Sequence, residues 1–398
     1  MKINFSKPDI SQEEIDEVIE ALKSGWITTG PKTKELERQV AEYTNANKAI
    51  CLNSATAAME VGLRLFGIKE GDEVITSAYT YTASASVIHH VGAKIVLVDT
   101  EEDSYFMNPK KLEEAITENT KAIIPVDIAG VPCDYEKIYE IVEKKKSLFK
   151  ANNDIQEKLG RILILADAAH AFGSTYKDKK VGELTDMASF SFHAVKNFTT
   201  AEGGALVWKK NIDGIDDEEI YKRLQLLSLH GQNKDALAKT KLGSWEYDIK
   251  GLYYKYNMPD ITAAIGLGQF KRYEGLLNRR HEIIKMYNEG FKDSKIEFLN
   301  HFGKDYVSNG HLYMTRVKGI DESKRNEIIE EFGRRGIAVN VHYKPLPMHT
   351  AYKNLGFDIK NYPNAYNQYK NMITLPLHTL LTDEEVEYII ENYKDIVG

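Results

Sequence analysis

The stretch MASFSFHAVKNFTTAEGGALVW, residues 187–208, places a lysine, Lys196, between two short apolar runs. MASFSF and GALVW are rich in β-forming residues, and the adjacent Gly203 and Gly204 are a turn signal between them. This composition predicts two strands joined by a loop that carries the lysine. A single lysine in a loop is most often a solvated surface charge, so a functional role for Lys196 has to be inferred from the rest of the chain.

The same kind of apolar run recurs, separated by helical patterns, through the first half of the sequence. The runs are KAICLN, EVIT, KIVLVD, AIIPVDI and RILILAD, and a helix is expected from about Ala57. Apolar runs bounded by helices indicate strands that are buried on both faces. The pattern therefore predicts an α/β fold with a mostly parallel central sheet.

The N-terminal segment SQEEIDEVIEALKSG predicts a helix that precedes this sheet. Ser11 and Glu14 form a capping-box pattern, and Gly25 is expected to end the helix. Its apolar residues recur at i, i+3, i+4 and i+7; they are Ile15, Val18, Ile19 and Leu22.

The second half of the chain is organised differently. The polar segment 143–160 is interpreted as a surface insertion that lengthens a crossover helix, and the tyrosine-rich segment 247–257 as a linker. A helical pattern from 259 to 291 then leads into a smaller unit. We therefore expect a large domain at 1–255, with the N-terminal helix, and a linker helix with a smaller C-terminal α/β domain at 256–398.

Composition limits the possible functions. The 398 residues carry a net charge of −7, which argues against a nucleic-acid surface. No apolar stretch approaches the ~20 residues that span a bilayer, and the N-terminus has no signal-peptide core, so we expect a cytoplasmic protein that binds neither membrane nor nucleic acid. Cys51 and Cys133 fit no disulfide framework or metal spacing; buried free thiols and no metal are expected.

Ligands of open α/β sheets bind beyond the carboxyl ends of the strands, so polar residues at those positions are candidates. They are Ser54, Ala55 and Thr56 after the first run, Tyr81 after the second, Asp167 and His170 after RILILA, and Ser191 with Lys196. A helix start can hold a phosphate, a tyrosine can lie against a planar ring, an aspartate can pair with a pyridinium nitrogen, and a lysine can form a Schiff base.

Each residue also has a plain structural interpretation: an ordinary helix cap, a core tyrosine, a capping aspartate or a solvated lysine. The combination favours a pocket for pyridoxal phosphate. An NAD enzyme is the less favoured alternative, because SATAAM stands where a G-x-G-x-x-G motif would follow the first strand.

Several motifs resemble the DegT/DnrJ/EryC1/StrS family of sugar aminotransferases, which are fold type I pyridoxal-phosphate enzymes. The motifs span nearly the whole chain and are SGWITTGPKTKELE, NSATAAME, GDEVITSAYTYTAS, KAIIPVDIAGVP, DAAHAFGSTYK, SFHAVKNFTTAEGG, KYNMPDITAAIG and VHYKPLPMHTAY. Within the family, SGWITTGP, FSFHAVKN, AEGG and KYN most resemble the enzymes that make UDP-4-amino-4-deoxy-L-arabinose.

The resemblance implies a role for each matching residue. Lys196 would bind the cofactor as a Schiff base and later move a proton as a base, and Asp167 would keep the pyridine nitrogen protonated. His170 would bond the ring's phenolic oxygen and Tyr81 would stack on the ring. The phosphate ligands would be Ala55, Thr56, Ser191 and, from the neighbouring subunit, Asn257; the sugar-nucleotide cleft would be lined by Thr28, Gly30, His342 and Tyr343.

The resemblance thus implies a homodimer with shared active sites that moves an amino group from L-glutamate to C4 of a nucleotide-linked 4-keto sugar, with a UDP-sugar preferred. Asp127 departs from the family's H-x-x-G pattern and could alter sugar contacts, whereas Ala166 and the 143–160 segment are departures expected to lie outside the chemistry. Relatives that dehydrate sugars carry His at the position of Lys196, so its retention favours transamination. A non-catalytic relative that binds the cofactor or a sugar nucleotide as a regulator is the alternative.

Overall fold

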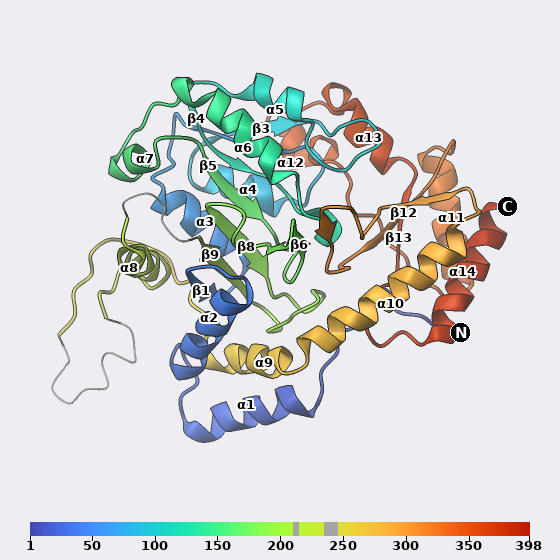
Figure 1. Cartoon of the computed structure of the whole chain (residues 1–398), viewed down its shortest axis with the longest axis horizontal. Coiled ribbons are helices and arrows are strands. Elements are labelled where there is room, and N and C mark those ends of the chain that lie inside the picture. Colours follow the sequence, from blue (N-terminus) through green and yellow to red (C-terminus); the bar gives the residue numbers. More distant parts are fainter. Residues whose placement is uncertain (210–214, 235–245) are drawn as a thin grey trace.

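The computed structural model describes residues 1–209, 215–234 and 246–398, and it is built around a seven-stranded sheet (Figure 1). The strand order is β1-β9-β8-β5-β4-β2-β3. The strands are β1 (Lys48–Leu52), β2 (Glu73–Ser77), β3 (Lys94–Val98), β4 (Thr120–Ile124), β5 (Leu163–Asp167), β8 (Met187–Ser191) and β9 (Gly204–Trp208). Only β9 runs against its two neighbours, β1 and β8, so the mostly parallel sheet expected from the sequence is confirmed.

Helices cover both faces of this sheet, which is why its strands are apolar throughout. Adjacent residues of a strand point to opposite faces, and Ile164 and Leu165 of β5 accordingly belong to two separate cores. One face packs against α3 (Ala55–Leu65), α4 (Ala83–His90) and α8 (Asp217–Ser228), and the other against α2 (Pro31–Tyr43), α5 (Pro109–Ala115) and α6 (Tyr135–Lys144).

A smaller antiparallel sheet lies toward the C-terminus and has its own apolar core. Its strands are β10 (Ile296–Phe298), β12 (Tyr313–Val317) and β13 (Met372–Leu375), and its helices are α11 (Glu322–Arg334) and α14 (Asp383–Val397). A third sheet, β11 (Tyr306–Val307), β6 (Thr175–Tyr176) and β7 (Lys179–Lys180), joins segments from both halves. The division at residues 255 and 256 stays a prediction.

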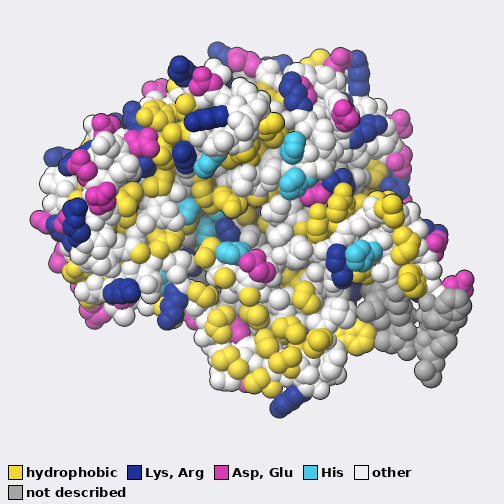
Figure 2. All heavy atoms as spheres, turned by 180° about the vertical axis from the view of Figure 1, so that it is seen from behind, with side chains coloured by type: hydrophobic (Ala, Val, Ile, Leu, Met, Phe, Trp, Pro, Cys, Tyr) yellow, Lys and Arg dark blue, Asp and Glu magenta, His cyan; other side chains and the backbone are white. Residues whose placement is uncertain are grey.

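The N-terminal helix α1 (Gln12–Ser24) confirms its predicted caps, but its apolar residues are not where a core would need them. Glu14 and Ala21 are buried, whereas Ile15, Ile19 and Leu22 are 45%, 40% and 54% exposed. Apolar side chains gather at the end of the molecule that carries α1 (Figure 2). Exposed apolar clusters of this kind are typical of interaction surfaces.

Helix α9 (Asp260–Phe270) packs against α1 and α2 and fixes the turn between them. The buried Asp260 carboxylate accepts hydrogen bonds from the backbone N–H groups of Gly30, Lys32 and Thr33, at 2.8, 3.0 and 2.9 Å. A carboxylate at a helix N-terminus satisfies donors that have no partner within the helix. The motif KYNMPDI therefore holds the turn of SGWITTGP in place.

Two expectations about helices need correction. The pattern from 259 to 291 forms two helices, α9 and α10 (Tyr273–Phe291), with a break at Lys271 and Arg272, and α10 runs from the large sheet to the small one (Figure 1). The 143–160 segment does not lengthen α6. It forms a separate short helix, α7 (Asp154–Leu159), because the buried Gln156 side chain donates to the carbonyl of Phe66 and anchors the segment there.

Two expectations from composition can be compared with the structure. Both cysteines are free and buried, as expected. In residues 1–209, 215–234 and 246–398, no helix is long and apolar enough to cross a membrane, and no group of side chains is arranged to hold a metal ion.

Candidate active site

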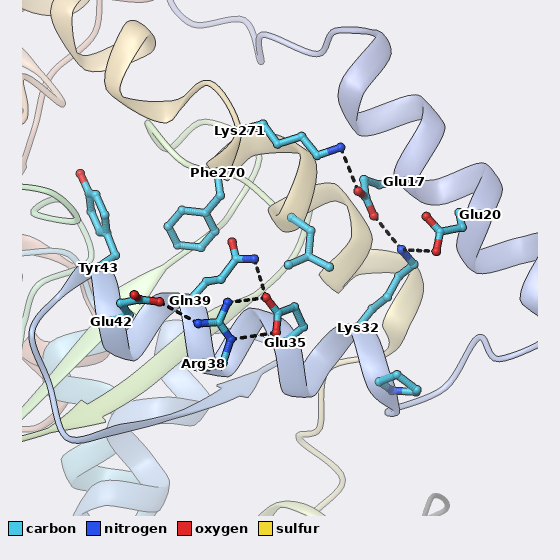
Figure 3. A pocket seen from close by; sticks show the side chains of 12 residues that line it. Glu17, Glu20, Lys32, Glu35, Arg38, Gln39, Glu42, Tyr43, Phe270 and Lys271 are labelled. Atoms are coloured by element: carbon cyan, nitrogen blue, oxygen red, sulfur yellow. Dashed lines mark hydrogen bonds and ion pairs between the residues drawn. The ribbon is translucent and has the colours of Figure 1, made fainter.

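Several cavities are large enough to hold a substrate, and two of them contrast in their chemistry. One, of about 660 Å³, lies between α1, α2 and α9, and its charged side chains pair with one another (Figure 3). Lys32 contacts Glu17 at 2.6 Å, and Arg38 contacts Glu35 and Glu42 at 2.7 Å each. Mutually paired surface charges are poorly suited to catalysis, so this cavity is not the candidate.

The other cavity, of about 390 Å³, lies at the carboxyl ends of the parallel strands, where the sequence predicts the site. It brings together most of the predicted residues, which come from five segments of the chain. Those that line it are Ala55, Thr56, Tyr81, Asp167, His170, Ser191, Lys196, His342 and Tyr343.

Lys196 and Asp167 both line this cavity, and the charge of each affects the pKa of the other. Burial lowers the pKa of the Lys196 amine to about 8, although the Asp167 charge opposes this shift. Burial raises the pKa of the Asp167 carboxyl, against the effects of its hydrogen bonds and of Lys196. A lysine with this pKa has a substantial neutral fraction near neutral pH, as a nucleophile or general base requires.

Two donors hold the Asp167 carboxylate in a defined orientation. The Ser84 hydroxyl, fully buried on α4, donates to Oδ2 at 2.6 Å, and the backbone N–H of Ala169 donates to Oδ1 at 3.2 Å. The Ser84 hydroxyl also lies 2.8 Å from that of Thr80. Hydrogen bonds to the charged form favour ionisation and offset part of the burial cost.

The hydrogen bonds of His170 determine where its proton lies. The backbone N–H of Ala129 donates to Nδ1 at 3.2 Å, so Nδ1 is an acceptor and the proton of the neutral ring is on Nε2. Burial, followed by Lys196, holds the pKa of His170 well below its usual value. Nε2 lies 3.1 Å from the Tyr343 hydroxyl and can donate to an oxygen at that side of the cavity.

The N-terminus of α3 forms the opposite end of the cavity. The Ser54 side chain accepts from the N–H of Ala57, and its carbonyl accepts from that of Ala58, whereas within the described residues the N–H groups of Ala55 and Thr56 have no protein acceptor. Gly204 lets β9 approach this turn, because a Cβ there would lie 2.4 Å from the Ala55 nitrogen. Free N–H groups and the helix dipole favour a phosphate.

Tyr81 and Tyr343 form part of the cavity wall. Tyr81 is 59% exposed, which excludes the interpretation as a core tyrosine, and its ring centroid lies 5.8 Å from that of Tyr343. His342 is held by Thr374, whose hydroxyl lies 3.0 Å from Nδ1, and burial lowers the pKa of its ring to about 3. His170 and His342 are therefore both neutral near neutral pH.

Three predicted site residues do not line this cavity: Thr28, Gly30 and Asn257. They lie together instead, because the Asn257 amide donates to the Thr29 hydroxyl at 2.6 Å, and that hydroxyl donates to the Met258 carbonyl at 2.6 Å. The turn of SGWITTGP and the KYN segment thus form one cluster that does not line the cavity, although Asn257 pairs with Leu52 at the end of β1.

Asp127 was expected to affect contacts with the sugar, but it does not line the cavity and so offers no direct contact there. Asp127 is fully buried, and its carboxylate accepts from the Cys133 N–H at 2.8 Å and from the Tyr135 hydroxyl. Burial raises the pKa of this carboxyl to about 7. Ala166 is also fully buried, in the core beneath the sheet.

The sequence reasoning missed several residues of the cavity. Ser84 carries no recognisable pattern of its own, and only the packing of α4 beside β5 reveals its contact with Asp167. His193 and Glu202 line the opening, with Nε2 and Oε1 3.5 Å apart. Both stand in the predicted loop around Lys196, so their proximity to the lysine in sequence was the available signal.

The chain is similar to known proteins over nearly its whole length. The DegT/DnrJ/EryC1/StrS aminotransferase family matches residues 8–394. Spore coat polysaccharide biosynthesis protein SpsC of Bacillus subtilis is 37% identical over 400 residues, covering 99% of this chain and 96% of SpsC. An uncharacterized protein of Methanocaldococcus jannaschii, MJ1066, is 40% identical over 396 residues, covering 98% and 97% of the two chains.

Solved structures extend the likeness to the whole fold. Spr1654 of Streptococcus pneumoniae, provisionally assigned as a sugar aminotransferase and solved in PLP and PMP forms, superposes in its PMP form with a TM-score of 0.97 at 57% identity, covering 100% and 99% of the chains. PseC of Helicobacter pylori, an aminotransferase of pseudoaminic acid biosynthesis, superposes with a TM-score of 0.87 at 29% identity, covering 100% and 99%. The fold is that of fold type I aminotransferases, and the chain belongs to the DegT/DnrJ/EryC1/StrS aminotransferase family.

Proposed function

We propose that this aminotransferase uses pyridoxal phosphate to move an amino group from L-glutamate to C4 of a nucleotide-linked 4-keto sugar, with UDP as the preferred nucleotide. The observation that carries the proposal is the pairing, in one cavity, of Asp167 with a lysine whose pKa is about 8. A role in polysaccharide or sugar biosynthesis agrees with the similarity to SpsC, a spore coat polysaccharide biosynthesis protein, and to PseC, an aminotransferase of pseudoaminic acid biosynthesis. A cytoplasmic location stays a prediction.

The residues of the cavity fit this cofactor. Ala55 and Thr56 offer free N–H groups for the phosphate, with Ser191 beside them, and Tyr81 offers an exposed aromatic face for the ring. Asp167 would face the pyridine nitrogen and His170 Nε2 would donate to the phenolic oxygen. When bound, pyridoxal phosphate supplies an electrophilic aldehyde and a ring that accepts the electron pair of a broken C–H bond.

The chain's own groups supply the proton transfers. In its neutral form Lys196 would take the proton from the α-carbon of the amino donor. In the second half of the reaction, its protonated form would give a proton to the sugar carbon that receives the amino group. The hydrogen bonds from Ser84 and the Ala169 N–H stabilise the charged form of Asp167 and offset part of the burial that raises its pKa, and the carboxylate would favour a protonated nitrogen opposite. His170 stays neutral with its proton on Nε2, so it donates without adding a charge.

The test separates the two half-reactions. Glutamate alone should change the absorbance of the bound cofactor from the aldehyde form to the amine form and release 2-oxoglutarate. Incubation with UDP-, dTDP- and GDP-4-keto sugars should then yield an aminated product, identified by mass, with the UDP-sugar reacting fastest. If glutamate and other amino donors leave the spectrum unchanged although the cofactor is bound, the protein is a non-catalytic binding relative.

We further infer that two copies of the chain share each active site. Asn257 and the Thr28 to Gly30 turn form one cluster that does not line the cavity of their own chain, and this supports a role for them in the cavity of a neighbouring chain. Apolar side chains are exposed in the same region of sequence: Ile27 is 50% exposed and Leu252 97%. Together with the exposed residues of α1 they provide the apolar area that a stable interface needs.

Mixed dimers test this arrangement. Lys196→Ala and Asn257→Ala chains, each impaired alone, should regain activity when they are dissociated and reassociated together. In a mixed dimer, one site carries both substitutions and the other site carries neither. The mixed dimer should therefore approach about half of the wild-type rate per dimer. Thr117→Ala, distant from both clusters, is the matched control for reassociation. No recovery in demonstrated mixed dimers would place Asn257 and Lys196 in the same chain's site.

A further inference from the structure

The hydroxyl of Tyr79 contacts two backbone groups that lie more than 260 residues further along the chain. It donates to the carbonyl of His342 at 2.9 Å and accepts from the N–H of Tyr343 at 3.0 Å, across sequence separations of 263 and 264 residues. One hydroxyl can do both, since it carries one proton and two lone pairs. Both polar groups of this single peptide unit are thus satisfied by one side chain.

Tyr79 itself is held rigidly. It directly follows β2 of the large sheet, is fully buried, and packs its ring against that of Tyr105 with 5.3 Å between the centroids. Burial raises the pKa of its hydroxyl well above the ordinary value, so the proton that it donates to His342 stays in place. The neighbouring carbonyl of Ala78 accepts from the N–H of Leu346 at 3.0 Å and ties the same segment down again.

The peptide that Tyr79 holds carries two side chains of the cavity wall. Tyr343 reaches His170 Nε2 at 3.1 Å and lies beside Tyr81, so its position determines the width of the cavity opposite Lys196. The ring of His342 is held by Thr374 of β13 and stacks on Phe5. Without the Tyr79 hydroxyl, the backbone between these two side chains would lose its direct hydrogen bonds to the large sheet.

We propose that Tyr79 is a positioning residue for the acceptor substrate: its hydroxyl holds His342 and Tyr343 at the wall against which the 4-keto sugar is placed. This inference rests on the proposed function. Apart from His170, whose Nε2 lies 3.1 Å from the Tyr343 hydroxyl, the residues proposed for the phosphate and the ring come from the large sheet and make no hydrogen bond to this peptide. The sugar half of the reaction should therefore depend on the hydroxyl, and the glutamate half should not.

Tyr79→Phe removes only the hydroxyl. Tyr287→Phe is the matched control, because Tyr287 is also fully buried and donates to a backbone carbonyl, that of Pro376 at 2.8 Å, but lies in the C-terminal core. The first measurement is hydrogen exchange at the Tyr343 amide, resolved by mass spectrometry. The exchange should accelerate roughly tenfold in Tyr79→Phe, because one hydrogen bond of typical strength is lost, and should not change in Tyr287→Phe.

The second measurement follows each half-reaction by cofactor absorbance in single turnovers. In Tyr79→Phe the sugar concentration for half-saturation should rise about tenfold, whereas the glutamate half-reaction should stay within about twofold of wild type. In a double-mutant cycle, Tyr343→Phe together with Tyr79→Phe should lose less than the sum of the single losses, since the Tyr343 hydroxyl is carried by the peptide that Tyr79 holds.

Three results for Tyr79→Phe would overturn the inference. The first is an unchanged hydrogen-exchange rate at the Tyr343 amide, and the second is faster exchange with an unchanged sugar concentration for half-saturation. The third is an equal loss of activity in both half-reactions. The second of these would make Tyr79 a purely structural residue. A wild-type chain that converts none of the keto sugars would instead contradict the proposed function, and it would do so before any variant is compared.

Discussion

Replacing Lys196 by alanine is expected to reduce transamination by at least about 10⁴-fold, the upper range for loss of a general base, because the same amine also binds the cofactor. Borohydride reduction of the wild-type protein should leave a pyridoxyl group on the peptide that contains Lys196, and the variant should yield none. Cofactor retained by the variant should be released by dialysis, since only the noncovalent contacts at α3, Asp167 and His170 remain.

The matched control is Lys179→Ala, which removes an exposed lysine of β7 that does not line the cavity. It should keep the wild-type rate and the same labelled peptide. A pyridoxyl group on a lysine other than Lys196 would show that the cofactor is attached elsewhere and would refute the assignment of the site.

Asp167→Asn should have the second largest effect. It removes the negative charge opposite the pyridine nitrogen while keeping the shape, and we expect a loss of about 10²–10³-fold, the usual size for removal of one preorganised electrostatic group. The Ser84 hydroxyl can still bond the amide oxygen, so the fold should be retained.

The pH dependence gives a second signature of Asp167→Asn. The neutral amine of Lys196 is the reactive form, so the rate at which the cofactor-free protein captures pyridoxal phosphate should rise with pH through a pKa of about 8. The Asp167 charge raises that pKa, so its removal should move the rise to lower pH. Stopped-flow absorbance measures both profiles.

Asp127→Asn is the control for Asp167→Asn, because Asp127 is a neighbouring buried carboxyl whose contacts are to Cys133 and Tyr135 rather than to the cavity. An amide at this position can still accept from the Cys133 N–H, and we expect the capture profile to keep its midpoint. If the midpoint of the pH profile moves equally in both variants, the pKa of Lys196 depends on nearby buried charge in general and not on Asp167 in particular.

Much of this protein follows from local features of its sequence. The apolar runs and helical patterns identify the strands of the large sheet, and Ser11, Glu14 and Gly25 mark the ends of α1 correctly. These signals are local because hydrogen-bonded caps and residue periodicity involve neighbours within a few positions. The polar residues that follow the strands identify Asp167 and Lys196, since the ends of parallel strands meet at one edge of a sheet.

Local patterns failed where packing overrides them. The apolar stripe of α1 predicts a helix correctly, but periodicity does not say which surface the stripe contacts, and in this chain it is exposed. The 143–160 segment is polar enough to suggest a simple extension of a helix. Its buried Gln156 instead bonds the Phe66 carbonyl, a partner 90 residues away, and this contact creates a separate helix.

Only the tertiary structure decided how the site is held and completed. Ser84 meets Asp167, and the Tyr79 hydroxyl meets the peptide of His342 and Tyr343, across 83 and about 263 residues of sequence. The grouping of Asn257 with Thr29, neither of which lines the cavity, likewise joins segments 228 residues apart. Such contacts leave no periodic pattern in the sequence, because each depends on how two complete elements pack. The sequence by itself therefore identifies the reactive residues, and the fold determines which neighbours orient them.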